Sequence, residues 1–369
     1  MPTYPFLTDL VRALPATVPF VGPEALQRMR GRPFRARLGA NESVFGPSPK
    51  SIAAMEAAAA SAFMYGDPEN FELRAAIAKH HGVSIENVAV GEGIDGLLGL
   101  AVKVAVAPGE VVVTSDGAYP TFNYHVAVGG GRLVKVPFRD DKEDLGAVLD
   151  AGRAENAKIL YVSNPNNPMG SWWSASEIEG MISALPPTVL FCLDEAYCDT
   201  APPAAVPDID ISNPRVLRFR TFSKAYGLAG ARVGYALGEA GLISIFDKIR
   251  NHYGMSRSGQ IGALAALADQ DYLAETVGRI AAGRDRLAQI ARENGLAPLP
   301  SATNFVTMDC GRDGTYATRV LDEIIARDVF VRMPGVAPLN RCIRVTVGTP
   351  DDLDVFAEVL PEALRAAQG

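Results

Sequence analysis

The chain has 369 residues, 48% of them hydrophobic and 21% charged, and 35 Lys and Arg against 42 Asp and Glu give a net charge of −7. This length and hydrophobic fraction are typical of one large or two smaller globular domains and exclude a mainly disordered chain. Nucleic-acid binding needs clustered Lys and Arg, so an acidic chain without a basic block is not expected to have a nucleic-acid partner.

The cysteines and the apolar segments indicate a cytoplasmic protein with no metal site. The four cysteines are too few and too scattered for a disulfide framework or a zinc site, and we expect buried free thiols. Residues 1–15 lack the basic start and apolar core of a signal peptide. The most apolar stretch, residues 96–108, is too short to span a bilayer, so no membrane partner is expected.

Residues 88–237 alternate short apolar runs with segments of helical periodicity. One of these segments, residues 174–185, opens with the capping box Ser174-x-x-Glu177. Such alternation predicts the α/β class, with a mostly parallel sheet covered by helices on both faces. The runs expected to form strands are residues 110–114, 132–136, 158–162, 188–193, 215–219 and 231–236.

Beyond residue 238 the pattern changes and predicts a second, smaller α+β domain. Residues 242–249 and 260–292 have helical periodicity, two further strands are expected near residues 304–308 and 342–347, and a helix closes the chain. We expect a large domain of residues 35–245 and a small domain built from residues 1–34 and 246–369.

Polar side chains follow three consecutive strands of the predicted sheet. They lie in residues 163–170 (SNPNNPMG), 194–197 (DEAY) and 220–232 (RTFSKAYGLAGAR). Each alone is explained by a turn, a helix cap or a surface loop. Because ligands bind beyond the carboxyl ends of parallel strands, all three together predict one site in one crevice.

The chemistry of these residues describes a site for pyridoxal 5′-phosphate. A lysine at the end of a buried strand can form a Schiff base with a carbonyl. A nearby aspartate can stabilise a protonated pyridine nitrogen, which makes the ring an electron sink. A tyrosine and an asparagine can bind a phenolate oxygen, and two hydroxyls and an arginine can bind phosphate. These residues are, in that order, Lys224, Asp194, Tyr197, Asn167, Thr221, Ser223 and Arg232.

The sequence resembles the fold-type I aminotransferases of the aspartate aminotransferase superfamily, and within it histidinol-phosphate aminotransferase. The resemblance implies a large domain with a mostly parallel seven-stranded sheet, a smaller α+β domain and a homodimer with shared sites. It implies a transfer of an amino group from an amino acid or amino-alcohol phosphate to a 2-oxo acid such as 2-oxoglutarate. The motifs that carry it are residues 38–47 (LGANESVFGP), 65–68 (YGDP), 164–168 (NPNNP), 194–197, 223–230 (SKAYGLAG) and 343–350 (IRVTVGTP).

The resemblance also implies individual roles. Lys224 would bond to the cofactor and move the substrate proton, Asp194 would pair with the ring nitrogen, and Tyr197 and Asn167 would contact the ring's 3-oxygen. The amides of Ile94 and Asp95, at a helix N-terminus, would join Thr221, Ser223 and Arg232 around the phosphate. Ile94 stands where the family usually has a small residue and Gly96 where Glu is common, which puts side-chain contacts there in doubt.

Other implied roles concern the edges of the site. Phe122 is expected to stack on the cofactor ring, with Tyr119 and Tyr124 as rivals. Tyr65 would reach the phosphate from the other subunit. Arg344 would bind the anionic group of the substrate, Arg332 would assist with a substrate phosphate, and Asn167 would also contact the substrate. Arg257 lies close to the expected site without an assigned role.

Three alternatives stay open at this point. The first is the same chemistry on an aromatic amino acid, and the second is decarboxylation of threonine phosphate by a similar enzyme. The third is a regulator that binds pyridoxal phosphate, but such regulators carry a DNA-binding segment, and residues 1–35 are too short and too little basic for one.

Overall fold

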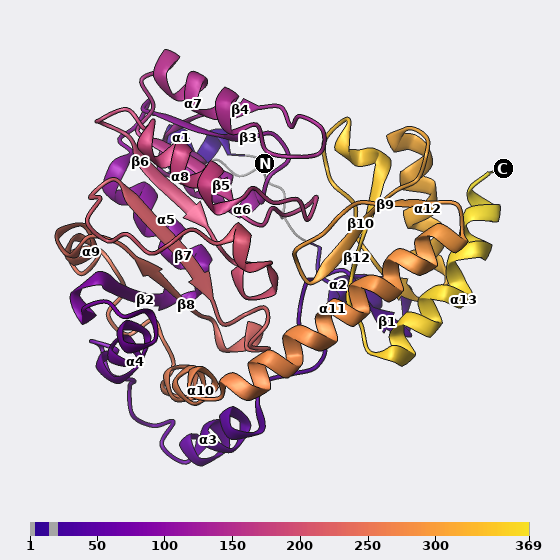
Figure 1. Ribbon diagram of the computed structural model, residues 1–369, viewed down its shortest axis with the longest axis horizontal. Coiled ribbons are helices and arrows are strands. Elements are labelled where there is room, and N and C mark those ends of the chain that lie inside the picture. Colours follow the sequence, from indigo (N-terminus) through magenta and orange to yellow (C-terminus); the bar gives the residue numbers. More distant parts are fainter. Residues whose placement is uncertain (1–3, 15–20, 369) are drawn as a thin grey trace.

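The computed structural model describes residues 4–14 and 21–368 and has a seven-stranded sheet as its largest element. The spatial order of the strands is β2-β8-β7-β6-β5-β3-β4 (Figure 1). The strands are β2 (Val88–Glu92), β3 (Val111–Ser115), β4 (Arg132–Val136), β5 (Ile159–Ser163), β6 (Leu190–Asp194), β7 (Val216–Thr221) and β8 (Val233–Leu237).

The pairing of these strands confirms the predicted mostly parallel sheet. β4, β3, β5, β6 and β7 pair in parallel, and β8 runs antiparallel to both β7 and β2. All six apolar runs form strands close to their expected bounds. β2 was not among them, because its sequence, VAVGE, has too short an apolar run to stand out from the turn that follows.

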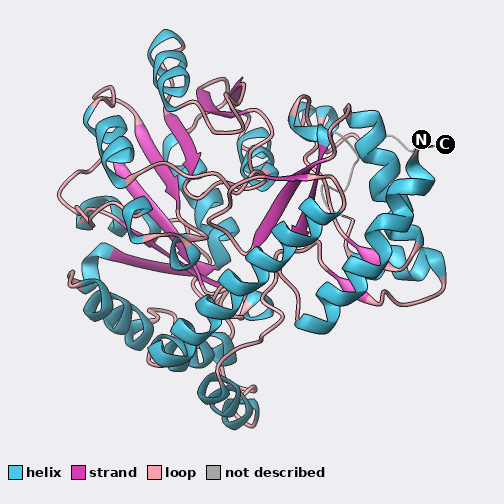
Figure 2. Ribbon diagram, turned by 45° about the vertical axis from the view of Figure 1, so that its right-hand side comes forward, coloured by secondary structure: helices cyan, strands magenta, loops and turns pink. Residues whose placement is uncertain are grey.

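Helices cover both faces of this sheet (Figure 2). Cα–Cβ bonds alternate along a strand, so the side chains of β5 point to two different helix layers. Ile159 and Tyr161 pack in one apolar cluster with α5 and α6, whereas Leu160 and Val162 pack in another with α7 and α8. The helices of this part are α3 (Pro49–Ala59), α4 (Phe71–His81), α5 (Gly93–Ala105), α6 (Pro120–Val128), α7 (Leu145–Ala154), α8 (Ala175–Ser183), α9 (Ala240–Phe246) and α10 (Arg257–Leu267).

The capping box expected at Ser174 is present and fixes the start of α8. The Ser174 hydroxyl accepts a hydrogen bond from the Glu177 amide, and the Glu177 carboxylate accepts one from the Ser174 amide. The expected helical stretch 260–292 is divided into α10 and α11 (Gln270–Glu293). Asp269 between them leaves the helical conformation, and its carboxylate accepts a hydrogen bond from Lys50 Nζ at 2.7 Å.

A smaller three-stranded antiparallel sheet lies at the other end of the molecule, beside α11 (Figure 1). Its order is β12-β10-β9, and the short strands β1 and β11 pair in parallel next to it. The remaining elements are α1 (Asp9–Ala13), α2 (Pro23–Arg30), β1 (Ala36–Arg37), β9 (Ala297–Pro298), β10 (Phe305–Asp309), α12 (Gly314–Ala326), β11 (Val329–Phe330), β12 (Cys342–Thr346) and α13 (Pro350–Ala367).

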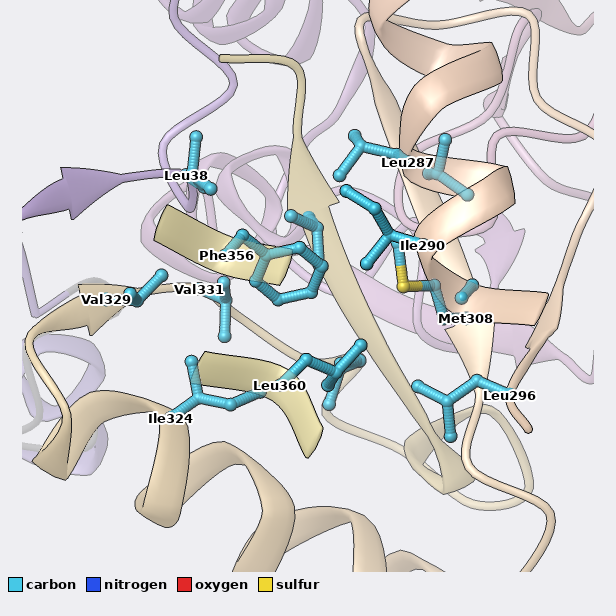
Figure 3. Close-up of a cluster of buried hydrophobic side chains, with 14 of the residues drawn as sticks. Leu38, Leu287, Ile290, Leu296, Met308, Ile324, Val329, Val331, Phe356 and Leu360 are labelled. Atoms are coloured by element: carbon cyan, nitrogen blue, oxygen red, sulfur yellow. The ribbon is translucent and has the colours of Figure 1, made fainter. Parts of the chain in front are cut away.

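One apolar core joins this smaller sheet to its helices and to the segment that follows β1 (Figure 3). Leu287 and Ile290 of α11 lie beside Met308 of β10, and Phe356 of α13 packs in the same cluster. Leu38 belongs to this core although it is far away in sequence. Leu38 therefore anchors the chain in the smaller lobe, which is the three-stranded sheet with α11, α12 and α13, before the chain enters the larger lobe, which is the seven-stranded sheet with its helices.

The predicted domain division into residues 35–245 and residues 1–34 with 246–369 stays a prediction. Within the described residues no helix is long and apolar enough to cross a membrane. All four cysteines are buried and free, as expected from their spacing.

Gly227 offers a direct test of how the loop after β7 is packed. It has φ +70°, and a Cβ atom there would overlap the backbone of Gly46. We expect Gly227→Ala to cost roughly 1–2 kcal/mol for the left-handed backbone and about 1–3 kcal/mol more for the overlap. Gly31→Ala is the matched control, because Gly31 has φ +69° and open space around it. Urea unfolding of both variants measures the difference, and equal losses would show that the loop tolerates a side chain.

Candidate functional site

The polar ends of β5, β6 and β7 meet at one edge of the large sheet, as predicted. These three strands are neighbours and parallel, with Ser163 paired to Asp194 and Asp194 paired to Phe219. A cavity of about 350 Å³ opens beyond them, within the usual size range of small-molecule sites. Nine of the residues expected to form the site line this cavity: Lys224, Asp194, Tyr197, Asn167, Thr221, Ser223, Arg232, Ile94 and Asp95.

Asp194 is a buried carboxylate held in one orientation by two donors. Its Oδ2 accepts a hydrogen bond from the Tyr161 hydroxyl at 2.6 Å, and its Oδ1 accepts one from the Ala196 amide at 2.9 Å. Burial raises the pKa of Asp194 to about 6, against the opposite effect of these donors and of Lys224. A cationic group placed in the cavity would offset this cost of burial.

The sequence pattern predicts Tyr161 only as part of an apolar strand and does not predict its contact with Asp194. Tyr161 is fully buried, and burial holds the pKa of its hydroxyl well above the usual range. A tyrosine inside an aliphatic strand needs a hydrogen-bond partner for its hydroxyl, and this is the signal that could have identified it. Only the pairing of β5 with β6 identifies Asp194 as this partner.

Lys224 and Tyr197 meet at a residue that the sequence reasoning assigned no role. Lys224 Nζ donates to the carbonyl oxygen of Asn41 at 3.1 Å and lies 5.6 Å from the centre of the Tyr197 ring. The Asn41 amide nitrogen donates to the Tyr197 hydroxyl oxygen at 3.0 Å. Asn41 lies within the LGANES motif, but no local pattern indicated which side chains it would contact.

A second group of lining residues has the chemistry that binds an anion. The Thr221 hydroxyl donates to Ser223 Oγ at 3.0 Å, and the guanidinium of Arg232 lies beside Gly93, where a Cβ atom would approach Nη2 to 2.6 Å. α5 begins at Gly93, so the amides of Ile94 and Asp95 are in its first turn and lack helical acceptors. An anion here would meet free amides, the positive end of a helix and a guanidinium.

The Asp95 side chain lies beside Arg232, and its carboxylate does not bind the free amides at the start of α5. Its Oδ2 lies 3.6 Å from Arg232 Nη2 and 3.4 Å from the Tyr119 hydroxyl, which donates to it. Its Oδ1 is buried without a hydrogen-bond partner among the described residues. The Asp95 carboxylate therefore orients Arg232, while the backbone amides of Ile94 and Asp95 remain as donors to an anion.

Arg344 of β12 approaches the site from the smaller lobe and contacts Asn167, which lines the cavity, but Arg344 itself is not among the lining residues. Its Nη1 donates to Asn167 Oδ1 at 2.5 Å and its Nη2 donates to the carbonyl of Gly39 at 3.1 Å. Burial lowers the pKa of Arg344 to about 10, and its Nε is buried without a partner among the described residues. A guanidinium with an unused buried donor is suited to an anionic ligand.

Arg332 and Arg257 also lie outside the cavity lining. Arg332 pairs with Arg344 through a β-bridge, and its Nη2 donates to the carbonyl of Val21 at 2.7 Å. The structure thus brings Arg332 next to a site residue through its backbone. Arg257 begins α10 and lines a separate cavity of about 190 Å³ with Asp67 and Asn70.

The expected stacking residue requires a correction. Phe122 is fully buried in the core beneath the sheet, where it stacks on Tyr161 with ring centres 4.2 Å apart, and it does not line the cavity. Tyr119, named as a rival, does line it. Both residues belong to the segment at the start of α6, and helix geometry turns the apolar Phe122 toward α5 and the sheet. Tyr124 is also absent from the lining.

Tyr65 lies on the surface and does not line the cavity of its own chain. Its side chain is 77% exposed, and its ring centre lies 4.8 Å from that of Tyr253, which is also exposed. Phe63, two residues away, is 85% exposed. These aromatic side chains form an apolar surface of the kind that marks an interaction site.

A buried carboxyl group, that of Glu143, supports the loop that contains Asn167, and no pattern in the sequence around this residue before α7 predicts the role. Glu143 accepts hydrogen bonds from the Ser163 hydroxyl at 2.8 Å, from Ser115 at 3.1 Å and from the Asn166 amide. Burial raises the pKa of Glu143 to about 7. The Glu143 carboxyl group therefore holds the end of β5 and the following loop in place through its hydrogen bonds to Ser163 and Asn166.

The residues present fit pyridoxal 5′-phosphate. The lining of the cavity supplies hydroxyls, free amides and Arg232 for a phosphate, and it supplies a carboxylate for a ring nitrogen. The same lining includes an amine that can bond to a carbonyl and an aromatic hydroxyl beside an amide. No cluster of metal-binding side chains occurs in the described residues.

Comparison with known proteins agrees with this chemistry. A family model described as aminotransferase class I and II matches residues 36–360. A histidinol-phosphate aminotransferase of Moorella thermoacetica is 31% identical over 366 residues, covering 98% of this chain and 94% of that protein. One from Pseudomonas fluorescens is 34% identical, covering 90% and 89%. A crystal structure of the Sinorhizobium meliloti histidinol-phosphate aminotransferase in complex with pyridoxal-5′-phosphate is 55% identical, with a TM-score of 0.96 and 98% of both chains covered.

The hydrogen bond from Tyr161 to Asp194 gives a testable prediction. Tyr161→Phe removes a donor to the charged form, so the pKa of Asp194 rises further above its usual range. The carboxylate is then protonated at a higher pH, and pyridoxal phosphate binds about tenfold more weakly near pH 6 to 7, with less loss at pH 8. Fluorescence titration of the apoenzyme with pyridoxal phosphate between pH 6 and pH 8 measures this.

Tyr235→Phe is the matched control for this measurement. Tyr235 is another buried tyrosine of the same sheet, but its hydroxyl is bonded to His81 at 2.9 Å, away from the cavity. The control is expected to bind pyridoxal phosphate as the unaltered protein does. Equal affinities of the two variants at every pH would contradict a role for Tyr161 at Asp194.

Proposed function

The chain belongs to the class I and II aminotransferases, enzymes that use pyridoxal phosphate, and we propose that its amino donor is an amino-alcohol phosphate of the histidinol phosphate type. The acceptor in this proposal is a 2-oxo acid such as 2-oxoglutarate. The relatives named histidinol-phosphate aminotransferase support this choice. The observation that carries it is the buried guanidinium of Arg344, which donates to the cavity-lining Asn167 and keeps its Nε without a partner among the described residues; such a donor suits an anionic end on the substrate.

We assign the contacts of the cofactor from the lining of the cavity. Asp194 faces the ring nitrogen, and Tyr197 and Asn167 bind the ring's 3-oxygen. Tyr119 lies against the ring in place of Phe122. The phosphate is bound by Thr221, Ser223 and Arg232 together with the amides of Ile94 and Asp95.

The side chains around the cofactor have different roles in amino transfer. Bound pyridoxal phosphate supplies an electron-poor ring that accepts the electron pair released at the substrate's Cα. Lys224 Nζ acts as the general base that takes the proton from that Cα atom. Asp194 stabilises the positive charge on the ring nitrogen, and its burial excludes water that would weaken this interaction.

Arg344 orients the substrate in this proposal. Its position between Asn167 and the Gly39 carbonyl leaves Nε for the anionic group of the donor or for the carboxylate of the acceptor. Arg332, linked to Arg344 by the β-bridge, assists with a substrate phosphate. One guanidinium that accepts either anion suits a reaction in which two substrates use the same site in turn.

We further propose that the enzyme works in the cytoplasm as a homodimer in which Tyr65 of one subunit reaches the phosphate site of the other. The exposed aromatic surface of Phe63, Tyr65 and Tyr253 supports this. The four free buried cysteines are compatible with a reducing compartment. Sedimentation of the holoenzyme at micromolar concentration is expected to give a dimer, and a fully active monomer would contradict the shared site.

An amino-donor screen tests the proposed substrate. With 2-oxoglutarate as acceptor, we expect kcat/KM for histidinol phosphate to exceed that for aromatic amino acids by at least about tenfold, because only the former presents a phosphate to the arginines. Glutamate formation measures the transfer. A preference for phenylalanine or tyrosine would overturn the proposal, and release of CO₂ from threonine phosphate would indicate a decarboxylase.

Lys224→Ala is the control for this screen. It removes both the covalent attachment of the cofactor and the general base, so no donor is expected to react, and the visible absorption that depends on the bond between Lys224 and the cofactor is lost. A variant that keeps its turnover would contradict the assignment of Lys224.

A further inference from the structure

Asn41 joins three parts of the molecule at one buried point. It lies between β1 and α3, is 2% exposed and has φ 56°. Its backbone carbonyl accepts hydrogen bonds from Lys224 Nζ at 3.1 Å and from the Asn304 amide at 3.0 Å. Its side chain lies between Thr346 of β12 in the smaller lobe and Tyr197 after β6 in the larger one.

The protons in this chain of hydrogen bonds can be placed one after another. Thr346 Oγ1 accepts the Asn41 backbone amide at 3.1 Å and lies 2.9 Å from Asn41 Oδ1. A hydroxyl has one proton, and here it goes to Oδ1, the acceptor beside it. With its oxygen facing Thr346, the Asn41 amide turns its nitrogen to Tyr197 and donates to the hydroxyl oxygen at 3.0 Å.

The proton of Tyr197 is then directed away from Asn41. The Asn41 amide is the only hydrogen-bond partner of this hydroxyl among the described residues, and Tyr197 lines the cavity. Rotating the Asn41 amide by 180° would leave the Thr346 proton facing an NH₂ group and would make Tyr197 donate to Asn41 instead. The hydroxyl of Thr346 therefore decides which way the Tyr197 proton points.

We propose that Asn41 and Thr346 are positioning residues that fix Tyr197 as a hydrogen-bond donor toward the 3-oxygen of the bound cofactor. The proposal rests on the role of Tyr197 given under the proposed function. It adds that this role is set from the smaller lobe, through two residues that do not contact the cofactor themselves. Without Thr346, the Asn41 amide has two nearly equal orientations, and in one of them Tyr197 is turned away.

The expected consequence is a change in the proton affinity of the bound cofactor. A donor to an oxyanion favours the charged form, so a lost donation from Tyr197 raises the pH at which the visible absorption changes. The titratable and charged groups that face Tyr197 are Lys224, Arg344, Tyr119 and Asp194. The variants described next leave all four in place.

The test is a pH titration of the visible absorption of the holoenzyme with a pair of Thr346 variants. Thr346→Val removes the hydroxyl with little change of volume, and the midpoint of the transition is expected to rise by about one pH unit, a tenfold change in proton affinity. Thr346→Ser keeps the hydroxyl and is expected to keep the midpoint within a few tenths of a pH unit. A purely structural role would move the stability of these variants but not the midpoint.

Asn41→Asp supplies a second variant that reverses the hydrogen bond. A carboxylate cannot donate to Tyr197, so the phenol donates to it and the midpoint rises at least as far as in Thr346→Val. The left-handed backbone at this position is compatible with Asp as it is with Asn. If this buried charge prevents folding, the Thr346 pair alone decides, because both of its members are neutral.

Tyr197→Phe separates this inference from the proposed function. A raised midpoint in Tyr197→Phe, with none in Thr346→Val or Asn41→Asp, would overturn the positioning role and leave the role of Tyr197 intact. An unchanged midpoint in Tyr197→Phe would overturn the contact between Tyr197 and the cofactor, and with it the inference. Raised midpoints in all three, with Thr346→Ser unchanged, are the result that the inference requires.

Discussion

The parallel pairing of β5, β6 and β7 is the interaction on which the site depends. Each strand ends on a polar residue, and the register sets Ser163 beside Asp194 and Asp194 beside Phe219. Because the strands are parallel and adjacent, their loops leave the sheet at the same edge and enclose one cavity. A shift of β6 by one residue against its neighbours would turn Asp194 to the opposite face of the sheet.

Burial behind this edge sets the electrostatics of the site. Asp194 has a raised pKa because it is removed from water, and Tyr161 and the Ala196 amide hold it in one orientation. Glu143 is likewise a buried carboxyl group with a raised pKa, and its hydrogen bonds to Ser163 and Asn166 hold the end of β5 and the loop that follows it. These groups carry a cost in the absence of a ligand, and a bound cation at Asp194 offsets part of it.

The smaller lobe contributes two side chains that contact residues at or next to the cavity. Arg344 and Thr346 lie on the same strand, β12, and reach Asn167 and Asn41 respectively. The core around Leu38 and Phe356 fixes β12 against the segment that contains Asn41 (Figure 3). In the proposed function, substrate binding by Arg344 and the orientation of Tyr197 therefore depend on packing that is remote from the cofactor.

The sequence by itself determined the class of fold, the order of the strands along the chain and the side chains that follow them. Apolar runs with alternating helices predict a parallel sheet, and Lys224, Asp194 and Arg232 have side-chain chemistry that few other cofactors require. These features are local, so the residues alone carry them. Contacts between distant segments were decided only by the tertiary structure. Tyr161 reaches Asp194 through strand pairing, Phe122 turns into the core while Tyr119 enters the cavity, and Asn41 meets Thr346 and Tyr197 across two lobes. No local pattern encodes such contacts, because their partners lie tens to hundreds of residues apart and meet only once both cores are packed.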